Sequence, residues 1–196
     1  GLEDVSLMRS LPNMKIINPA TYTEATEVVK YLCDTELDSP HYLRLGRQPV
    51  EDVLGSEYKF EFGKGQLIKD GEDITLISTG CMLGDVMEAA RLIESEYYGV
   101  RVINMPTIKP IDKDLIIECA ERTKMIFTIE DHSIIGGLGS AVAEVLSEYK
   151  PVKLFRIGLQ DEFPESGAPQ DLYKKYKLSP EEIHETVIDK WSKQSY

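Results

Sequence analysis

The sequence is poor in cysteine and lacks any long apolar segment. Its three cysteines, Cys33, Cys81 and Cys119, are far apart, and none belongs to a CxxC pair or a Cys/His cluster. This pattern predicts reduced thiols in a cytoplasmic protein rather than a disulfide framework or a zinc site. Since no apolar run approaches the roughly 20 residues that span a bilayer, we expect no membrane partner.

Basic residues are scarce relative to acidic ones. The chain has 22 Lys and Arg against 34 Asp and Glu, which gives a formal net charge of −12 at pH 7. Because binding to a phosphate backbone needs a basic surface, this balance argues against nucleic acid as a partner. The 196 residues, 42% of them hydrophobic, otherwise predict a globular chain of one domain, or one domain with a piece of another.

Self-contained catalytic arrangements are missing as well. The sequence offers no Ser–His–Asp arrangement, no metal-binding cluster and no nucleophile elbow. From its residues alone, the chain is predicted to be an α/β module without a complete catalytic site.

The first fifty residues alternate between helix and strand patterns. A short helix opens the chain, and residues 14–18 follow as a buried strand. Thr21 and Glu24 form a capping box, so a helix is expected from there to about Cys33. A second short strand is predicted at residues 42–45.

Residues 51–72 have a different character. They are rich in Glu, Gly and Lys, and Tyr58, Phe60 and Phe62 alternate as in an exposed strand. We interpret this segment as a linker that carries an edge strand. A long surface loop within one domain is the alternative.

From residue 73 the pattern is regular. Four short apolar strands are predicted, at residues 74–78, 100–105, 125–129 and 153–157. Helices are expected between and after them, with Asp112 and Ser179 as N-caps of two of these helices. Such alternation predicts a mostly parallel sheet between two helical layers, with a strand order that the sequence does not reveal.

Three glycines, Gly136, Gly137 and Gly139, lie between a predicted strand and a predicted helix. The free N–H groups and dipole of such a helix can hold a phosphate. However, Val142 stands where the dinucleotide-binding fingerprint has Gly or Ala, and no acidic residue directly follows the next strand. Close packing of the helix on the sheet is the favoured explanation.

Glu130, Asp131 and His132 end the strand before these glycines. Open α/β sheets bind ligands at the carboxyl ends of their strands, and a carboxylate beside a histidine can transfer protons. No third group that would orient the pair is recognisable. The favoured interpretation is structural, with the acids capping the loop and His132 making a hydrogen bond.

Arg44 and Arg47 lie at the end of a short strand, separated by Leu45 and Gly46. Alternation places the two arginines on opposite sides, and Gly46 allows close approach of the backbone. A guanidinium group in this place suits a phosphate or carboxylate ligand. An ion pair with one of the abundant acids explains it equally well.

A set of sequence strings occurs in order along nearly the whole chain. They are LMRSLPNM at 7–14, YLRLGR at 42–47, TIKPID at 107–112, EDHSIIGGLGSAVAE at 130–144, IGL at 157–159 and FPESG at 163–167. Together they resemble the transketolase family in its split, two-subunit form. The middle strings are also similar to deoxyxylulose-5-phosphate synthase and to the beta subunits of 2-oxo acid dehydrogenases.

This resemblance implies a division of the chain. Residues 1–66 correspond to the end of a pyrimidine-binding α/β domain plus a linker, and residues 67–196 to the carboxyl-terminal domain, with three layers around a mostly parallel sheet. In the family, thiamine diphosphate and its divalent metal, Mg or Ca, bind to other parts of the enzyme. The resemblance therefore implies no catalytic, cofactor-binding or metal-binding residue on this chain.

One functional residue carries over from the family. Arg47 matches the arginine that holds the phosphate end of the sugar substrate, which favours ligand binding over an ion pair for this residue. Neither His132 nor the glycines gain a role from the match.

The implied function belongs to a complete enzyme that transfers two-carbon ketol units between sugar phosphates. The chain alone would be inactive, and its partner would be the missing amino-terminal section or subunit, in a homodimer or heterotetramer. One alternative is a 2-oxo acid dehydrogenase beta subunit or a deoxyxylulose-5-phosphate synthase. Another is a non-catalytic regulatory module that binds an anion at the carboxyl ends of its strands.

Overall fold

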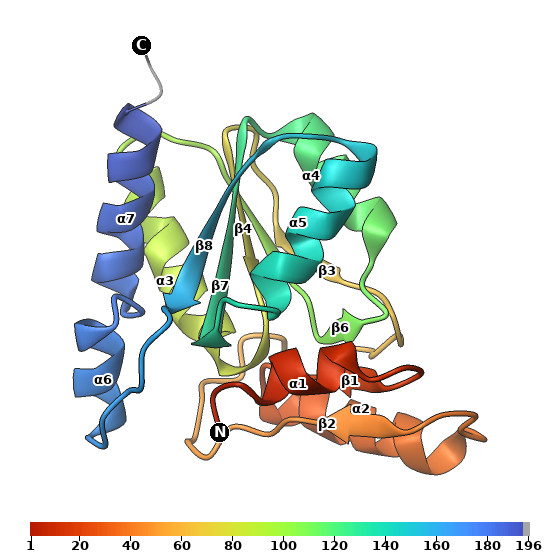
Figure 1. Ribbon diagram of the computed structural model, residues 1–196. Helices are drawn as coiled ribbons and strands as arrows, with labels where there is room; N and C mark the ends of the chain where they lie inside the picture. The colour runs from red at the N-terminus through yellow and green to blue at the C-terminus, as the bar shows by residue number, and fades with distance from the viewer. Residues whose placement is uncertain (194–196) are drawn as a thin grey trace.

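A five-stranded sheet forms the larger part of the molecule in the computed structural model, which describes residues 1–193 (Figure 1). Its strands are β3 (Gln66–Lys69), β4 (Ile74–Ser78), β5 (Val100–Asn104), β7 (Met125–Ser133) and β8 (Lys153–Leu159). Their order is β3-β5-β4-β7-β8, and only the edge strand β3 is antiparallel to its neighbour. The predicted mostly parallel sheet is confirmed.

Helices cover both faces of this sheet (Figure 1). They are α3 (Leu83–Glu94), after the short 3-10 turn η1 (Gly80–Met82), and α7 (Pro180–Ser192) on one face, with α4 (Lys113–Arg122) and α5 (Leu138–Tyr149) on the other. Alternate residues of each strand enter opposite cores: Leu76 packs with α3 and α7, whereas Ile77 packs with α4 and α5. The expected three-layer arrangement is therefore correct.

The predicted helix caps are present. The side chain of Asp112 accepts a hydrogen bond from the N–H of Leu115, and that of Ser179 accepts one from Glu182. A further helix, α6 (Pro169–Lys175), was not predicted, because it has no buried residue and hence no apolar periodicity.

A second, smaller sheet lies beside the carboxyl ends of β7 and β8, at the bottom of Figure 1. This unit contains α1 (Asp4–Ser10), β1 (Lys15–Ile17), α2 (Tyr22–Asp34) and β2 (His41–Leu43), with strand order β2-β1-β6. The strand β6 (Thr107–Lys109) comes from the second half of the chain and pairs antiparallel with β1. No strand was predicted at these residues, because the partner of β6 lies about 90 residues earlier in the chain.

The linker differs from its prediction. Residues 58–62 form no strand, and Tyr58 is buried with its hydroxyl group donating to Glu24. Phe62 stacks on Tyr31 of α2, with ring centroids 5.3 Å apart. The aromatic residues thus attach the linker to the small unit, and the edge strand of this segment is β3, further along the chain.

The capping box at the start of α2 is partly as predicted. Thr21 accepts from the N–H of Glu24. The carboxylate of Glu24 accepts from the N–H of Ala20, one residue earlier than in a regular box, and is fully buried. No helix in the described part of the chain is long and apolar enough to cross a membrane.

Candidate functional site

A hollow of about 800 Å³ lies between the small unit and the carboxyl ends of the large sheet. The segment after β2 forms one wall, and the start of α3, the end of β7 and α6 form the others. Its polar lining includes Asp4, Arg44, Arg47, Cys81, Asp85, Asp131 and Tyr173. This location agrees with the general rule that open α/β sheets bind ligands beyond the carboxyl ends of their strands.

The two arginines after β2 have different surroundings. Arg44 forms ion pairs with Asp4 (Nε to Oδ2, 3.1 Å) and with Asp131 (Nη1 to Oδ1, 2.8 Å). Arg47 lines the hollow, is exposed, and makes no ion pair within residues 1–193. The sequence left open whether these arginines form ion pairs or are free to bind a ligand. Arg44 forms ion pairs, and the guanidinium group of Arg47 is free of them in the described residues.

Asp131 is the most highly connected acid at the hollow. Its Oδ1 accepts from Arg44, and the thiol of Cys81 lies 3.2 Å from Oδ2. Although burial alone would raise the pKa of Asp131, the hydrogen bond from His132 and the charge of Arg44 lower it to about 2. Asp131 is therefore ionised at neutral pH.

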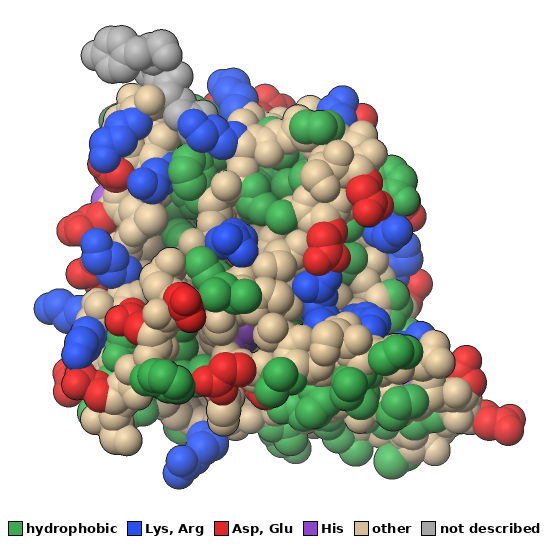
Figure 2. Space-filling model, in the orientation of Figure 1, with side chains coloured by type: hydrophobic (Ala, Val, Ile, Leu, Met, Phe, Trp, Pro, Cys, Tyr) green, Lys and Arg blue, Asp and Glu red, His purple; other side chains and the backbone are tan. Residues whose placement is uncertain are grey.

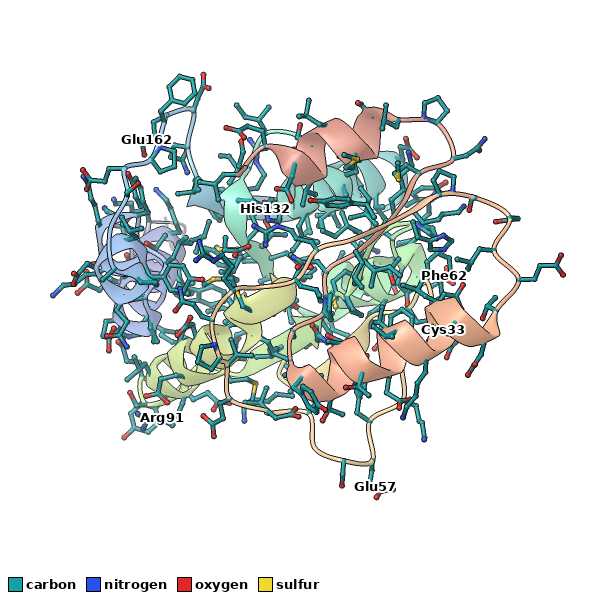
Figure 3. The ribbon with its side chains drawn as sticks, turned by 90° about the horizontal axis from the view of Figure 1, so that it is seen from below. Cys33, Glu57, Phe62, Arg91, His132 and Glu162 are labelled. Atoms are coloured by element: carbon teal, nitrogen blue, oxygen red, sulfur yellow. The ribbon has the colours of Figure 1, made fainter. Side chains whose placement is uncertain are left out.

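His132 follows Asp131 at the carboxyl end of β7 and lies beside α1 (Figure 3). Its Nε2 is 2.8 Å from Oε2 of Glu130, and its Nδ1 is 3.4 Å from Oδ1 of Asp131. Burial opposes the charged form, but these two neighbouring carboxylates raise the pKa of His132 to about 9. The side chain is 1% exposed, so the structural interpretation of this histidine fits better than proton transfer to a ligand.

Glu130 occupies the start of α5. Its carboxylate accepts from the N–H groups of Leu138 (2.7 Å) and Gly139 (2.9 Å), which are the groups a bound phosphate would need. A Cβ atom at Gly137 would lie 2.6 Å from the carbonyl oxygen of Ser133. The glycine-rich loop therefore serves close packing around an internal carboxylate, as the favoured interpretation stated.

Three residues of the hollow, Cys81, Asp85 and Tyr173, were not predicted from the sequence. Cys81 contacts both Asp131 and the hydroxyl group of Tyr173 (3.4 Å), and Asp85 lies nearby at the start of α3. Burial raises the pKa of Cys81 to about 12, and burial together with Glu181 raises that of Asp85 to about 6. The position of Cys81 in the turn η1, just beyond the carboxyl end of β4, was the available signal.

The described residues show neither a cluster of metal ligands nor an unoccupied helix N-terminus at the loop of Gly136, Gly137 and Gly139. Among residues 1–193, no group of His, Cys, Asp or Glu is arranged to hold a metal ion. The helix N-terminus that a diphosphate would suit is filled by Glu130. Through the guanidinium group of Arg47, this hollow can bind and orient an anionic group of a ligand.

Residues 63–183, more than half of the chain, match the family described as Transketolase, C-terminal domain. The chain belongs to this family. The resemblance drawn from its sequence strings is thereby confirmed.

Several curated relatives cover nearly the whole chain. It is 37% identical over 98% of its length to the putative transketolase C-terminal section of Methanocaldococcus jannaschii, and covers 60% of that protein. It is 36% identical to a 6-deoxy-6-sulfo-D-fructose transketolase subunit of a Clostridium species, over 93% of this chain and 56% of the relative. A 1-deoxy-D-xylulose-5-phosphate synthase of Caldanaerobacter subterraneus is 32% identical over 97% of the chain, which covers 31% of that enzyme. The chain thus spans less than two thirds of these relatives.

Solved structures support the same assignment. A split-gene transketolase, described as an inactive beta4 tetramer, matches with a TM-score of 0.92 and 41% identity, over 96% of this chain and 61% of that one. A transketolase from Pichia stipitis matches with a TM-score of 0.75 and 22% identity, over 95% of this chain and 26% of that one. The second match concerns the fold alone, and both agree with the transketolase C-terminal domain.

Proposed function

We propose that this chain is the carboxyl-terminal section of a split transketolase, and that the complete enzyme transfers two-carbon ketol units between sugar phosphates. The observation that supports this proposal most directly is the position of Arg47. Its guanidinium group lines the hollow without an ion-pair partner in the described residues, whereas Arg44 is held by two carboxylates. A free guanidinium can bind a phosphate through two parallel hydrogen bonds, so we assign the phosphate end of the substrate to Arg47.

The cofactor is assigned to other parts of the enzyme. We propose that thiamine diphosphate, with Mg or Ca, supplies the electron sink for ketol transfer when bound there. This chain contributes Arg47, the walls of the hollow and a packing surface. In this proposal neither His132 nor Cys81 acts as a catalytic group.

A missing amino-terminal section or subunit is the proposed partner, in a homodimer or heterotetramer. Leu7 and Leu11 of the small unit are 63% and 44% exposed, and Figure 2 shows hydrophobic side chains gathered over α1 and the small sheet. Such a surface suits coverage by another part of the assembly. The three free cysteines suit a cytoplasmic location.

The complete enzyme and the isolated chain should differ in activity. We expect the isolated 196-residue chain to show no ketol transfer and no binding of thiamine diphosphate, measured by coupled assay and by calorimetry. The chain combined with its amino-terminal section should show both. Turnover by the isolated chain would overturn the proposal.

A second candidate is deoxyxylulose-5-phosphate synthase activity, favoured by the 32% identity to such an enzyme over 97% of the chain. The two candidates differ in the substrates they consume. Decarboxylation of pyruvate by the complete enzyme would favour the synthase, and consumption of xylulose 5-phosphate would favour transketolase. An enzyme that leaves xylulose 5-phosphate unchanged contradicts the leading proposal.

A further inference from the structure

The segment that carries Arg47 is held at its base rather than at its tip. We call residues 44–48 the arginine loop. The N–H of Arg44 donates to the carbonyl oxygen of Ile17 (2.9 Å), which continues the pairing of β2 with β1. At Gly46 the loop lies against Cys81, since a Cβ atom built there would be 3.6 Å from the Cβ of Cys81. Arg47 itself extends into the hollow beyond these contacts.

The carboxylate of Asp131 holds this loop through both of its oxygens. One carboxylate oxygen accepts from Arg44, and the other lies 3.2 Å from the thiol of Cys81, against which Gly46 packs. Asp4 holds the other side of the Arg44 guanidinium group, and also accepts from the hydroxyl group of Tyr42 (2.7 Å). The arginine loop is therefore tied to both α1 and β7.

Asp131 is itself fixed in place by the large unit. The register between β7 and β8 shifts between Ile129 and Ser133, so residues 130–132 leave the regular pairing and turn their side chains to one cluster. His132 lies between Asp131 and Glu130, and Glu130 is held by two N–H groups of α5. A continuous row of alternating charges thus runs from α5 to the arginine loop.

These ion pairs neutralise the charge of Arg44 but not that of Arg47. Arg44 is compensated by two carboxylates and its side chain is only 13% exposed. Arg47, three residues later, has no such partner in the described part of the chain. The same contacts that orient the loop therefore leave a single uncompensated guanidinium group on it.

We propose that Arg44 and Asp131 are positioning residues for Arg47. By tying the arginine loop to β7, they set the place of the Arg47 guanidinium group and so the affinity for the phosphate end of the substrate. This inference rests on the proposed role of Arg47. Neither Arg44 nor Asp131 needs to touch the substrate, since small displacements of a binding group are sufficient to weaken a bidentate contact.

A double-mutant cycle in the complete enzyme tests this proposal. The variants are Arg44→Gln, Arg47→Gln and the pair together, and KM and kcat are measured with xylulose 5-phosphate and with unphosphorylated xylulose. We expect Arg44→Gln to raise KM for xylulose 5-phosphate about tenfold, the scale of one charge-assisted hydrogen bond, and KM for xylulose by less than about twofold. In the Arg47→Gln background, Arg44→Gln should raise KM by less than about twofold further, because the group it positions is gone.

Two further variants guard against a general loss of structure. Arg44→Lys keeps one donor toward the carboxylates and should restore part of the affinity for xylulose 5-phosphate. Arg9→Gln is the matched control: Arg9 also links α1 to the large unit, through Glu144 and the carbonyl oxygen of Gly136, but lies outside the hollow. Arg9→Gln should leave the ratio of the two KM values unchanged.

The outcomes separate this inference from the proposed function. Equal increases in KM for both sugars, or an Arg44→Gln effect of the same size in the Arg47→Gln background, would overturn the positioning role. If Arg47→Gln raises KM for xylulose 5-phosphate while Arg44→Gln does not, the positioning role alone fails. If Arg47→Gln leaves that KM unchanged, the proposed role of Arg47 fails, and the inference fails with it.

Discussion

Two of the junctions between the small unit and the large one are built differently. At the charged junction, Arg44 and Asp4 of the small unit meet Asp131 and His132 of the large unit. At the neutral-donor junction, the buried carboxylate of Glu24 accepts hydrogen bonds from Ala20, from the linker residue Tyr58 and from Asn104 of β5.

The two junctions have different expected roles: one stabilises the fold, and the other positions residues at the hollow. The charged junction borders the hollow, and its opposite charges compensate one another in pairs. In the neutral-donor junction a single charge is buried among uncharged donors, and burial raises the pKa of Glu24 despite these hydrogen bonds. We therefore expect the neutral-donor junction to dominate the free energy of unfolding, and the charged junction to dominate substrate affinity.

The largest effect on stability should come from Glu24→Ala. The substitution leaves the N–H of Ala20, the amide of Asn104 and the hydroxyl of Tyr58 buried without their shared acceptor. We expect the free energy of unfolding to fall by about 3–5 kcal/mol, measured by urea denaturation.

Glu27→Ala is the control for this change. Glu27 lies on the same helix and pairs with Lys30 at i,i+3 on the surface, so its removal should leave the free energy of unfolding almost unchanged. If Glu24→Ala and Glu27→Ala prove equally mild, the neutral-donor junction is not an anchor.

The second largest effect on the free energy of unfolding should come from alkaline pH, which weakens the charged junction. The pKa of His132 is raised from 6.5 to about 9, so its stabilisation is fully present below pH 6.5 and is lost as pH rises through about 9. A difference of this size corresponds to a loss on the order of 3 kcal/mol. The measurement is the free energy of unfolding between pH 6 and pH 10, with the His132 ring titrated by NMR.

The neighbours of His132 do not account for the same window. The pKa of Asp131 is lowered to about 2, and that of Cys81 is raised from 9 to about 12, so their contributions to the pH dependence of unfolding lie outside the window from pH 6.5 to about 9. A His132→Gln variant should lack this alkaline loss. An equal loss in the variant would assign the pH dependence to other groups.

The smallest effect is expected for Tyr58→Phe. It removes one of the hydrogen bonds to Glu24 but keeps the aromatic ring of the linker buried. We expect a loss of about 1 kcal/mol in urea denaturation, and no change in KM for xylulose 5-phosphate. A rise in that KM would show that the neutral-donor junction also influences the hollow.

Local patterns in the sequence were sufficient for most of the large sheet. The strands at 74–78 and 125–129 are short, mostly apolar runs, and Asp112 and Ser179 cap their helices as predicted. The failures have a common cause. Strand β6 depends on pairing with β1, and Tyr58 depends on an acid 34 residues earlier in the chain, which no local periodicity reports.

The candidate site was predictable only in outline. The strand end that carries Glu130, Asp131 and His132 was recognisable, and so was the pair of arginines after β2. Which arginine would be free depended on Asp4 and Asp131, which are 40 and 87 residues away from Arg44. The roles of Cys81 and Tyr173 likewise required the two units to be in place.

The α/β class, the helix caps and membership of the transketolase family could be predicted without the structure, because these depend on periodicity, short-range hydrogen bonding and ordered strings. The tertiary structure decided the strand order, the origin of β6 and the filling of the α5 N-terminus by Glu130. It also decided that Arg44 is compensated while Arg47 lines the hollow. Each of these depends on the distance between residues far apart in the chain, which is set only when the two sheets pack together.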